Sequence, residues 1–169
     1  MIRAAVVMGS TSDKDIALEA VETLQSFGVE ALVRVLSAHR TPMEAQGFAQ
    51  SLESEGVGVV IAFAGMAAHL AGAIAAHTVL PVIGVPVCSG SLGGMDALLS
   101  TVQMPPGIPV ATVAVNGAKN AALLAIEILA VQDKELRAKL LKERSRMRDK
   151  VLQADEALQK EIRDKQGRA

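Results

Sequence analysis

The sequence predicts a three-layer α/β/α domain built on a doubly wound parallel sheet. Five short segments are apolar almost throughout, a pattern typical of parallel strands that helices cover on both faces. Segments with helical periodicity alternate with them, as the connections between parallel strands require. The expected strands are Ala4–Met8, Ala31–Leu36, Val59–Ala64, Val82–Val87 and Val110–Val115.

Helix start signals follow the first two expected strands. The stretch from Ser12 to Asp15 resembles a capping box that opens a helix extending to about Phe27. The stretch from Thr41 to Glu44 is a better one, because Thr41 can cap and a proline occupies the first turn. Further helices are expected at about Ala67–His77, Met95–Gln103 and Ala118–Val131.

From about Lys134 the sequence predicts one long amphipathic helix. Its apolar residues recur every eleven positions, which is close to three helical turns, so they form one narrow stripe. The stripe is longer than the body of so small a domain. It either folds back on its own sheet or docks on another subunit, and the second is favoured. We therefore divide the chain into an α/β/α catalytic domain, residues 1–132, and a helical extension of the same domain, residues 133–169. The stripe consists of Leu136, Leu140, Met147, Val151, Leu158 and Ile162.

Composition indicates a soluble, cytoplasmic protein. Half of the 169 residues are hydrophobic, but no apolar run approaches the roughly 18–20 residues that cross a bilayer. The N-terminal segment does not have the pattern of a secretory signal. A single cysteine, Cys88, excludes a disulfide within the chain and a cysteine-based zinc site.

Charge is unevenly distributed. Residues 133–169 hold 12 Lys and Arg against 8 Asp and Glu, whereas residues 1–132 hold 5 basic and 10 acidic side chains. The acidic body has no Trp or Tyr and only three Phe, so it offers few platforms on which bases could stack. The interspersed acids of the tail are more typical of a solvated helix face than of a nucleic-acid site. We expect neither a nucleic-acid partner nor a membrane partner.

The residues after the first strand suit an anion. In an open parallel sheet, ligands bind beyond the carboxyl ends of the strands. The segment MGSTSD there contains Gly9, which lets the backbone approach a ligand, and the hydroxyls of Ser10 and Ser12, ahead of a helix N-terminus. Asp13 would repel a phosphate and is expected to face ribose hydroxyls instead. The alternative is that Ser12 and Asp13 only cap the helix.

The segment SAHRTP follows the second expected strand and favours a functional site. Arg40 is one of only five basic residues in the first 132, and its planar guanidinium suits a phosphate. His39 beside it is the natural proton carrier near neutral pH. The alternative is a surface His–Arg pair that merely opens a helix.

The remaining candidates point away from other chemistries. His69 either positions a substrate or bonds to backbone at the start of its helix, and His77 is expected to be structural at the other end of that helix. The scattered histidines predict no metal site. Cys88 is expected to be a buried, inert thiol. One His, one Arg and a phosphate-sized loop suit proton transfer on a small phosphorylated molecule, without a cofactor.

Six segments, taken in order, resemble a known family: MGSTSD, SAHRTP, AAHL, PVIGVPV, DALLSTVQMPPGIPVATVAV and AKNAALLA. They extend from residue 8 to residue 125 and cover most of the expected domain. On these motifs the chain resembles the bacterial N5-carboxyaminoimidazole ribonucleotide mutases of purine biosynthesis. The resemblance implies a flavodoxin-like subunit in a homo-octamer, with active sites at subunit contacts and the C-terminal helix packed on a neighbour.

The family reaction moves a carboxylate from the exocyclic nitrogen to ring carbon C4 of the aminoimidazole ribonucleotide, without ATP, biotin or metal. The resemblance gives His39 the role of general acid/base, with Ser37 lining the same site. The residues implied for substrate binding are Ser10, Ser12 and Arg40 at the 5′-phosphate, Asp13 at the ribose hydroxyls, and Gly65, Ala67, Ala68 and His69 around the carboxylate.

The chain also departs from many relatives of that family. Glycine is common where it has Phe63 and Met66, and proline is common where it has Ala71. Relatives that carboxylate the ribonucleotide directly with free carbon dioxide tend to carry Lys after the histidine, so Arg40 and Pro42 favour the mutase. That carboxylase remains one alternative. A non-enzymatic phosphosugar- or nucleotide-binding module, which would not need His39, is the other.

Overall fold

The computed structural model describes residues 3–166 and divides into two compact units, the first ending at Leu129. The first unit contains a five-stranded sheet in the order β2-β1-β3-β4-β5, and every neighbouring pair is parallel. The predicted fold class is therefore confirmed. The strands are β1 (Arg3–Met8), β2 (Glu30–Val35), β3 (Val57–Gly65), β4 (Val82–Val87) and β5 (Ala111–Thr112).

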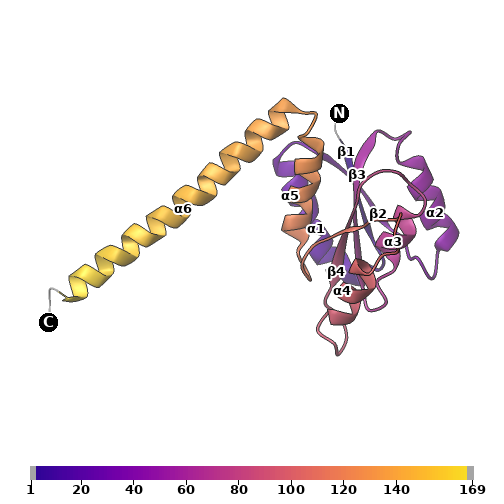
Figure 1. Cartoon of the computed structure of the whole chain (residues 1–169), viewed down its shortest axis with the longest axis horizontal. Helices are drawn as coiled ribbons and strands as arrows, with labels where there is room; N and C mark the ends of the chain where they lie inside the picture. The colour runs from indigo at the N-terminus through magenta and orange to yellow at the C-terminus, as the bar shows by residue number, and fades with distance from the viewer. Residues whose placement is uncertain (1–2, 167–169) are drawn as a thin grey trace. The chain divides into compact units, whose positions relative to one another are not determined.

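Helices cover both faces of this sheet (Figure 1). Helices α1 and α5 pack together on one face, and α2 and α3 pack together on the other. The order of strands places the carboxyl ends of β1 and β3 side by side at the centre, which is where a doubly wound sheet opens a crevice. The helices of this unit are α1 (Lys14–Ser26), α2 (Pro42–Ser51), α3 (Leu70–Ala75), α4 (Met95–Val102) and α5 (Ala118–Leu129), with a short 3-10 turn, η1 (Thr11–Asp13), before α1.

Burial differs between the central and the edge strands. Strands β1, β3 and β4 are buried almost throughout, as their apolar sequences predict. The prediction of burial on both faces was wrong for β2, whose second half is exposed, and for β5, which has only two paired residues. Both lie at sheet edges, where a strand has a single neighbour.

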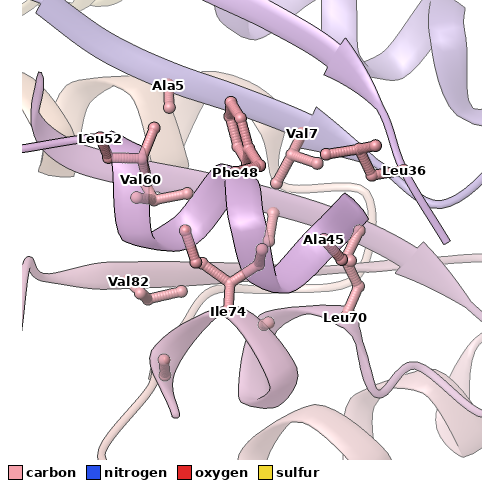
Figure 2. Packing of buried hydrophobic residues seen from close by; sticks show 14 of the residues in the cluster. Ala5, Val7, Leu36, Ala45, Phe48, Leu52, Val60, Leu70, Ile74 and Val82 are labelled. Carbon is pink, nitrogen blue, oxygen red and sulfur yellow. The ribbon is translucent and has the colours of Figure 1, made fainter. Parts of the chain in front are cut away.

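The core beneath α2 and α3 shows why these short helices are stable. In Figure 2, side chains from the two helices converge on β1, β3 and β4, with Phe48 and Ile74 among them. Both are almost fully buried. Burying a side chain of this size contributes about 1.5–3 kcal/mol, which a helix of six to ten residues needs because isolated short helices are marginal in water.

The predicted capping contacts differ from those observed. The capping side chain is that of Ser10 rather than Ser12. Ser10 Oγ accepts a hydrogen bond from the backbone N–H of Ser12 at the start of η1, and η1 then leads into α1. Thr41 does precede α2, but its hydroxyl makes no cap bond. Helix α3 begins at Leu70 rather than Ala67, because residues 66–69 have irregular backbone.

The second unit is dominated by α6 (Lys134–Gln166), a single helix of 33 residues. Asp133 caps it by accepting a hydrogen bond from the backbone N–H of Leu136 at 2.8 Å. The long helix predicted from about Lys134 is therefore observed. Among the described residues, four of the six apolar side chains of its stripe are exposed: Met147, Val151, Leu158 and Ile162. No helix among residues 3–166 has the length and apolar character needed to cross a bilayer.

Candidate functional site

A cavity of about 620 Å³ lies at the carboxyl ends of β1 to β4. It is the place where parallel-sheet proteins bind ligands. Nine of the ten residues proposed from the sequence line it, and the tenth, Ala68, is buried behind the surface. The lining residues are Gly9, Ser10, Ser12, Asp13, Ser37, Ala38, His39, Arg40, Ala64, Gly65, Met66, Ala67, His69, Leu70 and Ser89.

The wall after β1 is built from small polar residues. The backbone N–H of Gly9 donates to the carbonyl of Phe63 at 3.0 Å, so the chain stays paired with β3 just beyond the strand. Ser12 Oγ donates to Asp13 Oδ1 at 3.2 Å. The side chain of Asp13 makes no cap bond to α1, so the alternative that this pair only caps the helix is not observed.

Asp13 is the one buried carboxylate of this wall. Desolvation by burial raises the pKa of Asp13, and hydrogen bonds from Ser12 and from the backbone of Ser10 partly oppose that rise. A buried carboxylate of this kind is stabilised by hydroxyl donors, such as those of a sugar, that satisfy its oxygens.

The loop after β2 is closed on itself and presents Arg40. Thr41 Oγ1 accepts from the backbone N–H of Ser37 at 2.8 Å and donates to the Ser37 carbonyl at 3.1 Å. Ser37 Oγ accepts two hydrogen bonds from Arg40, one from the backbone N–H at 3.2 Å and one from Nε at 3.4 Å. Arg40 Nη2 donates to the carbonyl of Gly9 at 3.1 Å. The guanidinium therefore links the first two strand ends, and these contacts leave three of its five N–H groups for a ligand.

His39 and His69 meet across the cavity. His39 Nε2 lies 2.9 Å from His69 Nδ1, and the rings form an edge-to-face pair with centroids 5.0 Å apart. One of the two nitrogens must carry the proton that joins them. The His69 side chain therefore bonds to another imidazole and makes no cap bond at the start of α3, while its role toward a substrate stays a prediction.

The wall after β3 is apolar and tightly packed. A Cβ added to Gly65 would collide with Ser89 Oγ and lie 3.2 Å from the carbonyl of Val87, so a larger residue between the ends of β3 and β4 would require both neighbours to shift. Ala67 and Met66 complete this wall. Ser89 was not proposed from the sequence, although its place directly beyond β4 was a signal that could have found it.

The three departures from the resembling family lie in different surroundings. Phe63 is fully buried in β3, and Ala71 is buried in the core beneath α3; neither lines the cavity. Met66 stands at its rim, exposed. Of the three departures, only Met66 therefore bears on the site.

Two other sequence expectations concern reactive groups. Cys88 is exposed, contrary to the expected burial, because β4 ends at Val87 and the next residue leaves the sheet. Its backbone N–H donates to Asn116 Oδ1 at 2.8 Å. Among residues 3–166, no group of three or more His, Cys, Asp or Glu is arranged to hold a metal ion.

Comparison with known proteins gives the family. The model of one family, described as AIR carboxylase, matches residues 3–150. The chain belongs to the AIR carboxylase family. Relatives in this family are named N5-carboxyaminoimidazole ribonucleotide mutase. The one from Saccharolobus solfataricus is 55% identical over 152 residues, covering 90% of this chain and 96% of the relative. The one from Thermotoga maritima is 46% identical over 159 residues, covering 94% and 93% respectively.

The fold of this family member also matches solved structures. A crystal structure of Treponema denticola PurE is 30% identical, has a TM-score of 0.86, and covers 94% of this chain and 99% of that one. A crystal structure of a single-residue variant of Treponema denticola PurE2 gives the same TM-score and identity, covering 93% and 98% respectively. Both likenesses extend over nearly the whole chain.

Proposed function

We propose that this protein is an N5-carboxyaminoimidazole ribonucleotide mutase, an isomerase of de novo purine biosynthesis that yields the C4-carboxylated ribonucleotide. The names of its relatives support the assignment. The observation that carries it is the His39–His69 pair, which lies between a polar wall bearing Arg40 and an apolar wall at Gly65.

The polar wall binds the ribonucleotide. Arg40 donates two parallel N–H groups to the 5′-phosphate, and the hydroxyls of Ser10 and Ser12 complete the anion site beside the start of α1. Asp13 accepts from the ribose hydroxyls. Ser37 orients the Arg40 side chain through its hydroxyl.

His39 is the general acid/base of two coupled steps. In its protonated form it gives a proton to the carbamate nitrogen, the N–C bond breaks with its electron pair left on nitrogen, and carbon dioxide is released. Ring carbon C4 then attacks the carbon dioxide, and the C4 proton returns to the imidazole. His69 orients the His39 ring.

The apolar wall retains the carbon dioxide between the steps. Gly65 and Ala67 line a part of the cavity without charged side chains, with Ala68 buried behind them, and a neutral molecule held there stays beside C4. No ATP, biotin or metal takes part in these steps, because the carbon dioxide released from nitrogen is added to C4 and His39 regains from C4 a proton in place of the one it gave.

The test mixes the purified protein with the carbamate ribonucleotide, without ATP and without bicarbonate, and follows the product by ultraviolet absorbance. Product formed under these conditions supports the mutase. Product formed only when bicarbonate is added with the decarboxylated ribonucleotide indicates the direct carboxylase. Binding without conversion in either mixture indicates a binding module.

We also propose a cytoplasmic homo-octamer in which α6 packs on a neighbouring subunit. Residues 56–118 contain only one Asp or Glu and no Lys or Arg, the single charge being Asp96. Among the described residues, Asp96 Oδ1 is buried without a hydrogen-bond partner, while Met95, Leu99 and Val102 of the same helix are exposed. A surface that lacks charge and exposes apolar side chains favours coverage by another subunit. Light scattering that gave a dilute monomer would contradict this.

A further inference from the structure

Met66 has a backbone conformation that methionine rarely adopts. Its φ is 55°, and in the described part of the chain only Asn116 is another non-glycine residue with positive φ. Asparagine tolerates this conformation, and Asn116 also accepts a hydrogen bond from the backbone of Cys88. Methionine gains no such bond, so its conformation is strained. Strain of this kind persists where the surrounding structure determines it, and it clusters at ligand sites.

The Met66 side chain reaches from the loop after β3 to the loop after β4. A Cβ built on Gly90 would lie 4.0 Å from Met66 Cε, so the methyl group lies near Gly90 on the side where a side chain would project. Met66 shares the cavity lining with Gly65, Ala67 and Ser89, yet it is 61% exposed. One side of the thioether therefore faces the apolar wall and the other faces solvent.

We propose that Met66 is an apolar cap that separates the carbon dioxide end of the cavity from solvent. The inference rests on the proposed function. Carbon dioxide has no charge and no permanent dipole, so no hydrogen bond can hold it, and its retention depends on closing the path to water. An unbranched thioether closes an irregular opening well because it has three rotatable bonds and no polar hydrogen.

The position of Met66 fits this role better than a packing role. A side chain that serves only the core is buried, whereas Met66 is mostly exposed and its neighbours Gly65 and Ala68 are held without it. A negative φ would turn the Cα–Cβ bond away from its present direction. The strained backbone thus places the methyl across the gap between two strand ends.

The experiment measures escape of carbon dioxide during turnover. The unlabelled carbamate ribonucleotide is converted in ¹³C-bicarbonate at low conversion, and mass spectrometry gives the labelled fraction of the product carboxylate. A sample without protein measures spontaneous loss. The parent protein should give little label. Met66→Gly and Met66→Asn, which both tolerate positive φ, should each raise the labelled fraction severalfold and release decarboxylated ribonucleotide.

Two further variants separate the cap from other effects. Met66→Leu keeps an apolar side chain and should keep the labelled fraction close to that of the parent. Met43→Ala removes an exposed methionine that does not line the cavity, and its labelled fraction should match the parent.

The outcomes distinguish this inference from the proposed function. If the parent converts no substrate, the proposed function fails and the cap fails with it. If the parent converts substrate and Met66→Gly and Met66→Asn keep its labelled fraction, only the cap is overturned. A rise in Met66→Gly but not in Met66→Asn also overturns it, because backbone flexibility rather than the lost methyl group would then be the cause.

Discussion

The two walls of the cavity are built in opposite ways. After β1 and β2, polar side chains form the hydrogen bonds that hold the wall: Arg40 bonds to the Gly9 carbonyl and to Ser37, and Ser12 bonds to Asp13. After β3 and β4, the backbone is held by close packing, as where Gly65 meets Ser89.

This difference matches two kinds of ligand. An anion with a sugar needs donors and acceptors at fixed positions, which hydrogen-bonded side chains provide. A small neutral molecule needs only a volume of the right shape, which packing provides. The histidine pair marks the boundary, since His39 comes from the polar wall and His69 from the apolar one.

The largest effect is expected at the boundary. His39→Asn should lower kcat by roughly 10²–10⁴-fold, because the general acid/base is lost, while the product nucleotide still binds through the polar wall. Turnover and calorimetric affinity measure the two effects separately. Unchanged turnover would rule out proton transfer by His39.

The next effect belongs to the polar wall. Arg40→Ala should weaken nucleotide binding by about 1.5–3 kcal/mol, the usual range for a hydrogen bond to a charged group. That corresponds to a rise in Kd of roughly ten- to 150-fold. The control is Arg34→Ala, since Arg34 is an exposed cation of β2 that stacks on Phe48 outside the cavity. Equal losses in both variants would mean that only overall charge matters.

A substitution in the apolar wall should lower the free energy of unfolding more than it changes nucleotide binding. Gly65→Ala forces a Cβ against Ser89 and the Val87 carbonyl, and overpacking of this kind costs about 1–3 kcal/mol of unfolding free energy. Adding Ser89→Ala should restore part of the loss. Gly47→Ala is the control, because nothing lies within 4 Å of its added Cβ in α2 and the helix should gain about 0.5–1 kcal/mol. Denaturation by urea measures all three.

The smallest effect concerns the buried carboxylate. Because burial raises the pKa of Asp13, the folded state binds its proton more tightly than the unfolded state does. The stabilisation from that proton is complete below the ordinary aspartate pKa and is lost as pH rises through the raised value. Asp13→Asn should therefore stabilise the protein at neutral pH, leave it nearly unchanged in acid, and raise KM. The same stability gain at both pH values would contradict the assignment.

Much of this arrangement could be predicted from the sequence, because continuous apolar segments identify parallel strands and parallel strands place their carboxyl ends together. That reasoning located Ser10 and Arg40 in one cavity, and the family resemblance added Gly65 to it. The contact of His39 with His69 could not be predicted, since it depends on how loops thirty residues apart fold. The left-handed backbone of Met66 is likewise invisible in a sequence that has no glycine there.

The exposure of the edge strands could not be predicted from the sequence either. Val110–Val115 reads like a covered strand, but only Ala111 and Thr112 pair with β4, because beyond them the chain bonds irregularly, through Val113 to Gly84 and Asn116 to Pro86. Nothing in the local composition says which strand will lie outermost.

The brevity of β5 affects how copies of this chain can meet. An edge with two paired residues gives an incoming strand almost no backbone to add to, so a nearly uncharged flank does not become a template for ribbon-like polymers. On the β5 side of the sheet, any contact between copies therefore has to use side-chain surfaces rather than an added strand.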